Sequence, residues 1–150
     1  MDQDKLISDL QRDEGWRGYL YDDANGAKIV PGYTLKAHPT IAWGFALDVS
    51  PLTQSEAMPI LESRSREKWK EVCMALPWIE AAPEPVQRGC ANMAYNMGTT
   101  TLLKFNVFLS LLQQEKYEEA ADDLATTMWF RQVGQRAIRI QALIRSGANE

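Results

Sequence analysis

The chain has 150 residues, of which 45% are hydrophobic and 24% are charged, and its formal net charge is −4. Such a composition predicts one globular domain with a real core, and the acidic balance excludes a nucleic-acid binder that relies on general attraction to phosphate. No apolar run approaches the roughly 18 residues of a membrane span, and residues 1–10 lack the apolar stretch of a secretory signal, so we expect neither.

The first predicted element is a helix that ends near residue 14. Asp2 or Asp4 can cap its start, and Gly15 stands where a C-terminal glycine belongs. Its apolar stripe consists of Leu6, Ile7 and Leu10. Glu14 continues this stripe by one turn. Because a carboxyl group at the dry end of an apolar face is costly to ionise, Glu14 is a candidate proton donor.

Residues 16–49 show no helical period and are expected to form a small sheet of short strands. Turn signals interrupt the segment at Asn25-Gly26, Pro31-Gly32 and Pro39. The first of these is the strongest short hairpin signal. Asp22 and Asp23 lie beside it, near water and turn amides. They are read either as an ionised carboxylate of a reactive site or as ordinary turn residues.

Helical character returns after Pro51. One long helix is predicted over residues 53–76, and Pro59 should either kink it or move its start later. After the break at residues 81–85, shorter helices are predicted over 85–97, 105–113, 115–125 and 135–145. The fold class is therefore α+β, mostly helical with a small early sheet, and a polymer would lie in a cleft between the two parts.

The C-terminal segment is basic, with Arg131, Arg136, Arg139 and Arg145 in the last twenty residues. This cluster either orients an anionic polymer or forms an ordinary solvated helix face. Two cysteines, Cys73 and Cys90, are too few for a disulfide framework and lack metal-ligand spacing, which favours free thiols. His38 is the single histidine, so a histidine-based zinc site is excluded.

The carboxyl groups fit glycoside hydrolysis better than other chemistry. That reaction needs one protonated carboxylic acid for the leaving oxygen and one ionised carboxylate, held in different environments. Glu14 fits the first role, and Asp22 or Asp23 fits the second.

Three motifs make this part of the chain resemble the catalytic lobe of phage-type lysozymes, the family of the T-even bacteriophage lysozyme and of many endolysins (glycoside hydrolase family 24). They are Asp13-Glu14-Gly15-Trp16-Arg17, Tyr21-Asp22-Asp23-Ala24-Asn25-Gly26 and Thr40-Ile41-Ala42-Trp43-Gly44. The family pattern is a Glu-Gly pair, an Asp nine residues after the Glu, and a Thr that opens a glycine-containing strand. The resemblance implies that Glu14 is the general acid, that Asp23 is the second carboxylate and that Thr40 lies beside the attacking water.

The helical part carries further matches in the same order. Residues 88–98, 112–121 and 129–139 are each similar to segments of the family's helical lobe. The resemblance implies substrate contacts from Tyr95, Asn96, Gly44 and Arg136. Core packing remains an equal alternative for Tyr95, and Trp129 is expected in the core rather than stacked on substrate.

The resemblance also implies a domain organisation. A single lysozyme-like domain would span residues 1–150, with a catalytic lobe at 14–52, a connecting helix at 53–76 and a helical lobe at 84–147. Residues 1–13 would pack on the helical lobe.

Three departures from the family pattern stand out. Residues 27–39 form an insertion between the turn glycine and Thr40, which leaves Thr34 as a competitor for the threonine role. Phe45 replaces a histidine common in relatives, so the ion pair made there is expected to be absent. Ala42 stands where a glycine is usual.

The resemblance implies an endolysin that cuts the β-1,4 bond between N-acetylmuramic acid and N-acetylglucosamine in peptidoglycan, with inversion and without a cofactor. It would be a monomer made in the host cytoplasm, released by a holin-type membrane lesion and active on the wall from the periplasm. Its partner would be the glycan strand, with no nucleic acid and no membrane insertion. The alternatives are a lytic transglycosylase and a weakly active wall-binding virion module.

Overall fold

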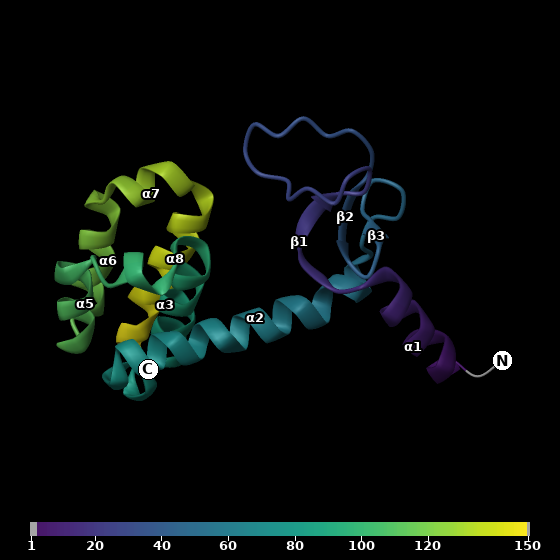
Figure 1. The fold of residues 1–150 in the computed structure, drawn as a ribbon. Coiled ribbons are helices and arrows are strands. Elements are labelled where there is room, and N and C mark those ends of the chain that lie inside the picture. Colours follow the sequence, from purple (N-terminus) through teal and green to yellow (C-terminus); the bar gives the residue numbers. More distant parts are fainter. Residues whose placement is uncertain (1–2, 150) are drawn as a thin grey trace. The chain divides into compact units, whose positions relative to one another are not determined.

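The computed structural model describes residues 3–149, which divide into two compact units on either side of the Met58–Pro59 bond (Figure 1). The first unit, residues 1–58, contains a helix and a small sheet, and the second unit, residues 59–150, is helical. The α+β class predicted from the sequence is therefore confirmed. Across residues 3–149, no helix is both long and apolar enough to cross a membrane.

The first unit opens with helix α1, Gln3–Glu14. The helix stops where Gly15 takes a positive φ of +67°, as the terminal glycine predicted. Of the proposed apolar stripe, Leu6 is half-buried, whereas Ile7 and Leu10 are exposed. The proposed cap Asp2 lies outside the described residues.

A three-stranded antiparallel sheet follows, in the order β1-β2-β3. Its strands are β1 (Arg17–Asp22), β2 (Pro39–Ala42) and β3 (Phe45–Ala46). The register places Thr40 opposite Tyr21 and Pro39 opposite Asp22. Ala42 and Gly44, with φ values of +58° and +72°, form the tight connection from β2 to β3.

The Asn25-Gly26 turn forms as predicted, but the expected tight hairpin does not. Gly26 has a φ of +70°, and its N–H donates to the carbonyl oxygen of Asp22 at 2.7 Å. The returning chain pairs with β1 only at an isolated bridge from Tyr21 to Lys28. Residues 29–38 then leave the sheet as a long loop, and β2 completes the pairing (Figure 1).

Helix α2, Gln54–Ala75, begins with a reciprocal capping box. The Thr53 N–H donates to Oε2 of Glu56 at 2.8 Å, and the Glu56 N–H donates to Oγ1 of Thr53 at 3.3 Å. Pro59 lies inside the helix, so it does not move the start later. The two units divide at this proline.

Short helices build the second unit. They are η1 (Pro77–Ala81), α3 (Glu84–Met97), α4 (Thr99–Leu102), α5 (Asn106–Gln113), α6 (Tyr117–Thr126), α7 (Met128–Val133), α8 (Gln135–Ser146) and η2 (Gly147–Asn149). α3, α5, α6 and α8 correspond to the four predicted helices, whereas α4 and α7 were not predicted. Each of these two has only four to six residues, too short for a periodic apolar pattern.

The core of the second unit lies where α3, α5, α6 and α8 pack together. Gly89 allows α3 to approach α8, because a β-carbon there would lie 2.8 Å from Cδ1 of Ile144. Cys90 is fully buried, and its burial raises the pKa of the thiol to about 12. Both cysteines are free thiols, as expected.

Candidate functional site

The residues proposed from the sequence fall into two groups, one in each unit. Glu14, Asp23, Thr40 and Gly44 belong to the first unit, and the second holds Tyr95, Asn96 and Arg136. The single domain predicted for residues 1–150, with its cleft and with residues 1–13 packed on the helical lobe, stays a prediction.

Glu14 is the last residue of α1, and its carboxyl group packs against Gly44. A β-carbon on Gly44 would lie 2.9 Å from Cδ of Glu14, so a side chain there would displace the Glu14 carboxyl group. Glu14 is nevertheless exposed in its own unit. The sequence predicted that Glu14 would be shielded from water by the apolar stripe of α1. Within the first unit this is wrong, because Ile7 and Leu10 are themselves 44% and 48% exposed and do not cover the helix end.

Asp22 is fully buried, and its carboxylate organises the loop that follows β1. Oδ1 accepts the N–H groups of Ala24 and Ala37 at 3.0 and 3.1 Å. Oδ2 accepts the hydroxyl of Tyr33 at 2.9 Å and the N–H of Lys36 at 2.7 Å. Burial by itself raises the pKa of Asp22, but these hydrogen bonds together outweigh it and leave the pKa below its usual value.

Asp23 differs from Asp22 in both burial and hydrogen bonding. Its side chain is exposed, and among residues 3–149 its carboxylate makes no hydrogen bond or ion pair. Its backbone N–H donates to the carbonyl oxygen of His38 at 3.1 Å. Of the two aspartates left open by the sequence, Asp22 is thus committed to the loop, and Asp23 has a carboxylate available to solvent.

Thr40 lies next to this point in the sheet. It is 1% exposed, and its Oγ1 donates to the same carbonyl oxygen of His38 at 3.1 Å. Thr34, the competing threonine, is exposed in the loop. One backbone oxygen therefore joins Asp23 and Thr40.

An aromatic pair lies beside Glu14 and Gly44 in the sequence. Trp16, two residues after Glu14, lies with its ring centroid 4.6 Å from that of Trp43, which precedes Gly44. Trp16 is 63% exposed. Sequence reasoning did not single out this pair.

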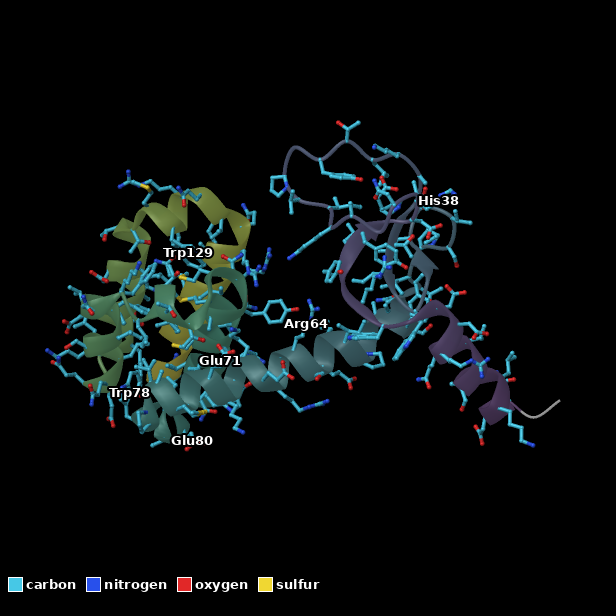
Figure 2. The ribbon with its side chains drawn as sticks, viewed as in Figure 1. His38, Arg64, Glu71, Trp78, Glu80 and Trp129 are labelled. Carbon is cyan, nitrogen blue, oxygen red and sulfur yellow. The ribbon has the colours of Figure 1, made fainter. Side chains whose placement is uncertain are left out.

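In the second unit, the candidates Asn96 and Arg136 take part in side-chain hydrogen bonds at the surface of α3. Nε of Arg136 donates to Oδ1 of Asn92 at 2.8 Å, and Nε1 of Trp129 donates to Oδ1 of Asn96 at 3.0 Å. Trp129 is 9% exposed and meets Phe105 edge to face, so its predicted core position is confirmed (Figure 2).

Tyr95 is 41% exposed, which decides against core packing for this residue. It lines an open hollow of about 390 Å³ together with charged residues of α2. Nζ of Lys68 contacts Oε2 of Glu71 in this hollow at 2.6 Å, and Oγ1 of Thr99 donates to the same carboxylate at 2.8 Å.

Two further features of the first unit have no signal in the sequence. One is the set of hydrogen bonds around Asp22. The other is an ion pair between His38 and Asp48, 3.0 Å from Nδ1 to Oδ2. Neither has a spacing signal, because the partners are brought together by the loop and by the sheet. Among residues 3–149, no cluster of three His, Cys, Asp or Glu side chains is arranged to hold a metal ion.

Comparison with known proteins gives short or distant matches, and no family model matches the chain. Probable T4-type lysozymes 1 and 2 of Dictyostelium discoideum are 32% and 33% identical over 56 and 57 residues, or 37% and 38% of this chain. The matched stretches span 33% and 34% of those proteins, about a third of their length.

A third match covers more of the chain at lower identity. The pre-baseplate central spike protein Gp5 of Enterobacteria phage T4 is 23% identical in an alignment of 155 positions that covers 92% of this chain and 27% of that protein. The sequence is therefore lysozyme-like, with its stronger similarity to T4-type lysozymes confined to about a third of the chain.

Proposed function

We propose that this chain hydrolyses the β-1,4 bond between N-acetylmuramic acid and N-acetylglucosamine in bacterial peptidoglycan. The similarity to T4-type lysozymes supports action on peptidoglycan. The observation that carries the finer proposal lies in the first unit, where two exposed carboxyl groups belong to one small sheet region. Glu14 rests on Gly44, and Asp23 is joined to Thr40 through the His38 carbonyl oxygen.

In this proposal Glu14 donates a proton to the glycosidic oxygen as the bond to the leaving sugar breaks. Asp23 accepts hydrogen bonding from a water molecule on the opposite face of the sugar, and Thr40 fixes the backbone that holds Asp23. The water oxygen bonds to the anomeric carbon, and its released proton passes to Asp23, which gives inversion. Because Glu14 is exposed in its own unit, bound glycan supplies the dry surroundings in which it donates this proton.

The remaining candidates contribute to binding in this proposal. Tyr95 offers an exposed aromatic face to a sugar ring. Asn96 and Arg136 hold the α3 surface through Trp129 and Asn92. The enzyme acts as a monomer on the wall from the periplasm, after synthesis in the host cytoplasm and holin-type release.

The test is release of reducing sugar from purified peptidoglycan. Glu14→Gln and Asp23→Asn should each lower the rate by roughly 10²–10⁴-fold, because positioned proton transfer contributes about that much. Asp13→Asn is the matched control. It removes a carboxylate adjacent to Glu14 that pairs with Arg12 on the surface, and it should leave the rate within about twofold. Full activity of Asp23→Asn would refute the two-carboxyl proposal.

The products separate hydrolysis from lytic transglycosylation. Mass spectrometry of the digested wall should show fragments that carry an added water. Fragments ending in 1,6-anhydromuramic acid would identify a transglycosylase, which needs no second carboxylate.

The match to the phage T4 central spike protein favours a second candidate, a wall-binding virion module of low activity. Co-sedimentation with purified sacculi, without release of soluble fragments, would support this candidate over the enzyme. The exposed Asp23 carboxylate favours the enzyme.

A further inference from the structure

His38, the single histidine of the chain, lies in the loop immediately before β2 (Figure 2). Its Nδ1 is 3.0 Å from Oδ2 of Asp48, which follows β3. The two side chains are 50% and 45% exposed. This pair therefore links two segments that are ten residues apart in the sequence.

The backbone of His38 is held at the same time. Its carbonyl oxygen accepts the N–H of Asp23 and Oγ1 of Thr40, each at 3.1 Å. The carbonyl oxygen of the next residue, Pro39, accepts the N–H of Leu47 at 3.0 Å, beside Asp48. The residue that carries the imidazole therefore contacts, through its own carbonyl oxygen, both Asp23, which binds the proposed water, and Thr40.

Three carboxylates act on the imidazole electrostatically. Asp48 comes from the segment after β3, and Asp22 and Asp23 come from the end of β1. The hydrogen bond that His38 donates to Asp48 and the charge of that carboxylate raise the pKa of His38 above 6.5, against an opposing effect of burial, and the charges of Asp23 and Asp22 add to the rise. A protonated ring offsets three carboxylates, whereas a neutral ring leaves them to repel one another.

We propose that protonated His38, paired with Asp48, is a positioning residue that fixes Asp23 and Thr40 through its own carbonyl oxygen. This inference rests on the proposed function, because it assigns a role in the same reaction. It makes the rate depend on the charge of a side chain that does not touch the substrate.

The raised pKa of His38 determines how the strength of the ion pair changes with pH. The ion pair contributes fully below 6.5, the usual value for histidine, and its contribution is lost as the pH rises through the higher value in the folded protein. An exposed ion pair changes an equilibrium by roughly two- to fivefold, so an effect of that size is expected.

The first experiment measures the link without activity. Since the chain has one histidine, its ring proton gives an unambiguous NMR titration. Protection of the Asp23 N–H against hydrogen exchange should fall about two- to fivefold across that titration. The Ile29 N–H, which donates to Leu20 at 2.9 Å in the same unit, is the reference amide and should keep its protection.

Two variants and one control sharpen the result. Asp48→Asn should lower the titration midpoint of His38 and, because the ion pair is lost, should reduce the change in Asp23 protection across the titration. His38→Gln should hold Asp23 protection at the lower value at every pH. Lys36→Gln removes an exposed charge two residues from His38 but keeps the backbone N–H that binds Asp22, and it should change neither quantity.

The second experiment compares hydrolysis rates. The ratio of the wild-type rate to the His38→Gln rate should fall from about two- to fivefold to one as the pH passes the His38 midpoint. A ratio independent of pH, Asp23 protection that ignores the titration, or an unshifted midpoint in Asp48→Asn would each overturn the inference. A wild-type protein without activity would refute the proposed function, and the amide measurements would still decide the link from His38 to Asp23.

Discussion

Gly44 and Glu14 show how a single residue controls the proposed acid. The backbone of Gly44 has a φ of +72°, and the Glu14 carboxyl group occupies the space that a side chain would need. The positive φ favours glycine here, and a side chain at this position would also displace the Glu14 carboxyl group. The two can be separated by experiment because Gly32 has only the first.

We expect Gly44→Ala to lower the hydrolysis rate by roughly 10- to 100-fold, because the added methyl group displaces the proposed acid. Its unfolding free energy should also fall by about 1–2 kcal/mol through the positive φ. Gly32→Ala, at a φ of +85° with nothing within 4 Å, should show the stability loss alone. Rates and thermal melts of both variants check this, and equal rates would mean that the Glu14 contact is not used.

Asp22 and Asp23 are neighbours with opposite environments. Asp22 is the last residue of β1 and its carboxylate turns into the loop, whereas Asp23 begins the turn and is exposed to solvent. The sequence offered both as candidates. It did not identify which one is buried, because the partners of Asp22 come from residues 24 to 37 and depend on the path of the loop.

The loop between β1 and β2 is organised around one buried carboxylate, that of Asp22. Its residues form no strand beyond an isolated bridge, and the Asp22 carboxylate gathers three backbone N–H groups and the Tyr33 hydroxyl. The turn signals of the sequence predicted an irregular segment here. They did not predict that the loop is ordered around a buried aspartate.

Asp22→Asn should loosen this loop, because an amide group cannot accept four hydrogen bonds. Trypsin should then cleave faster after Lys28 and Lys36, and Tyr33→Phe, which removes one of the bonds, should have a smaller effect. Because the pKa of Asp22 is lowered, its contribution is complete above the usual value of 3.8 and is lost as the pH falls through the lower value. The wild-type loop should therefore become more susceptible in acid, assayed with pepsin. Cleavage of Asp22→Asn at the wild-type rate would contradict this role.

The long helices were predicted well because their signals are local. The start of α2 follows the Thr53–Glu56 capping box, and α3 and α8 follow apolar periods that face the core. The effect of Pro59 was less predictable. Pro59 is the sixth residue of α2 and lacks the N–H that would donate to the carbonyl oxygen of Ser55, yet the helix continues through it.

The two units differ sharply in the amount of apolar surface that they bury. The second unit holds a large core, whereas the buried hydrophobic residues of the first unit, within residues 3–58, are Tyr21 and Ala42. Burial of apolar surface is the main stabilising term in folding, so local stability should differ in the same sense.

Hydrogen exchange should reveal this difference. Amides of β1 and β2 are expected to exchange through openings of lower free energy than amides of α3 and α8. Mass spectrometry of the peptides, taken over a time course of exchange, measures the protection of the sheet and of the helices in one sample. Equal protection in the sheet and in α3 would show that other interactions compensate for the small core of the first unit.

The sequence by itself determined the fold class, the main helices, the end of α1 at Gly15, the core position of Trp129 and the similarity to lysozymes. Each of these depends on local spacing or on motifs along the chain. Tertiary structure decided which aspartate is buried, that Glu14 is exposed in its own unit, that Gly44 receives the Glu14 side chain and that His38 pairs with Asp48. These depend on contacts between distant residues, which form only when the loop and the strands fold back on one another.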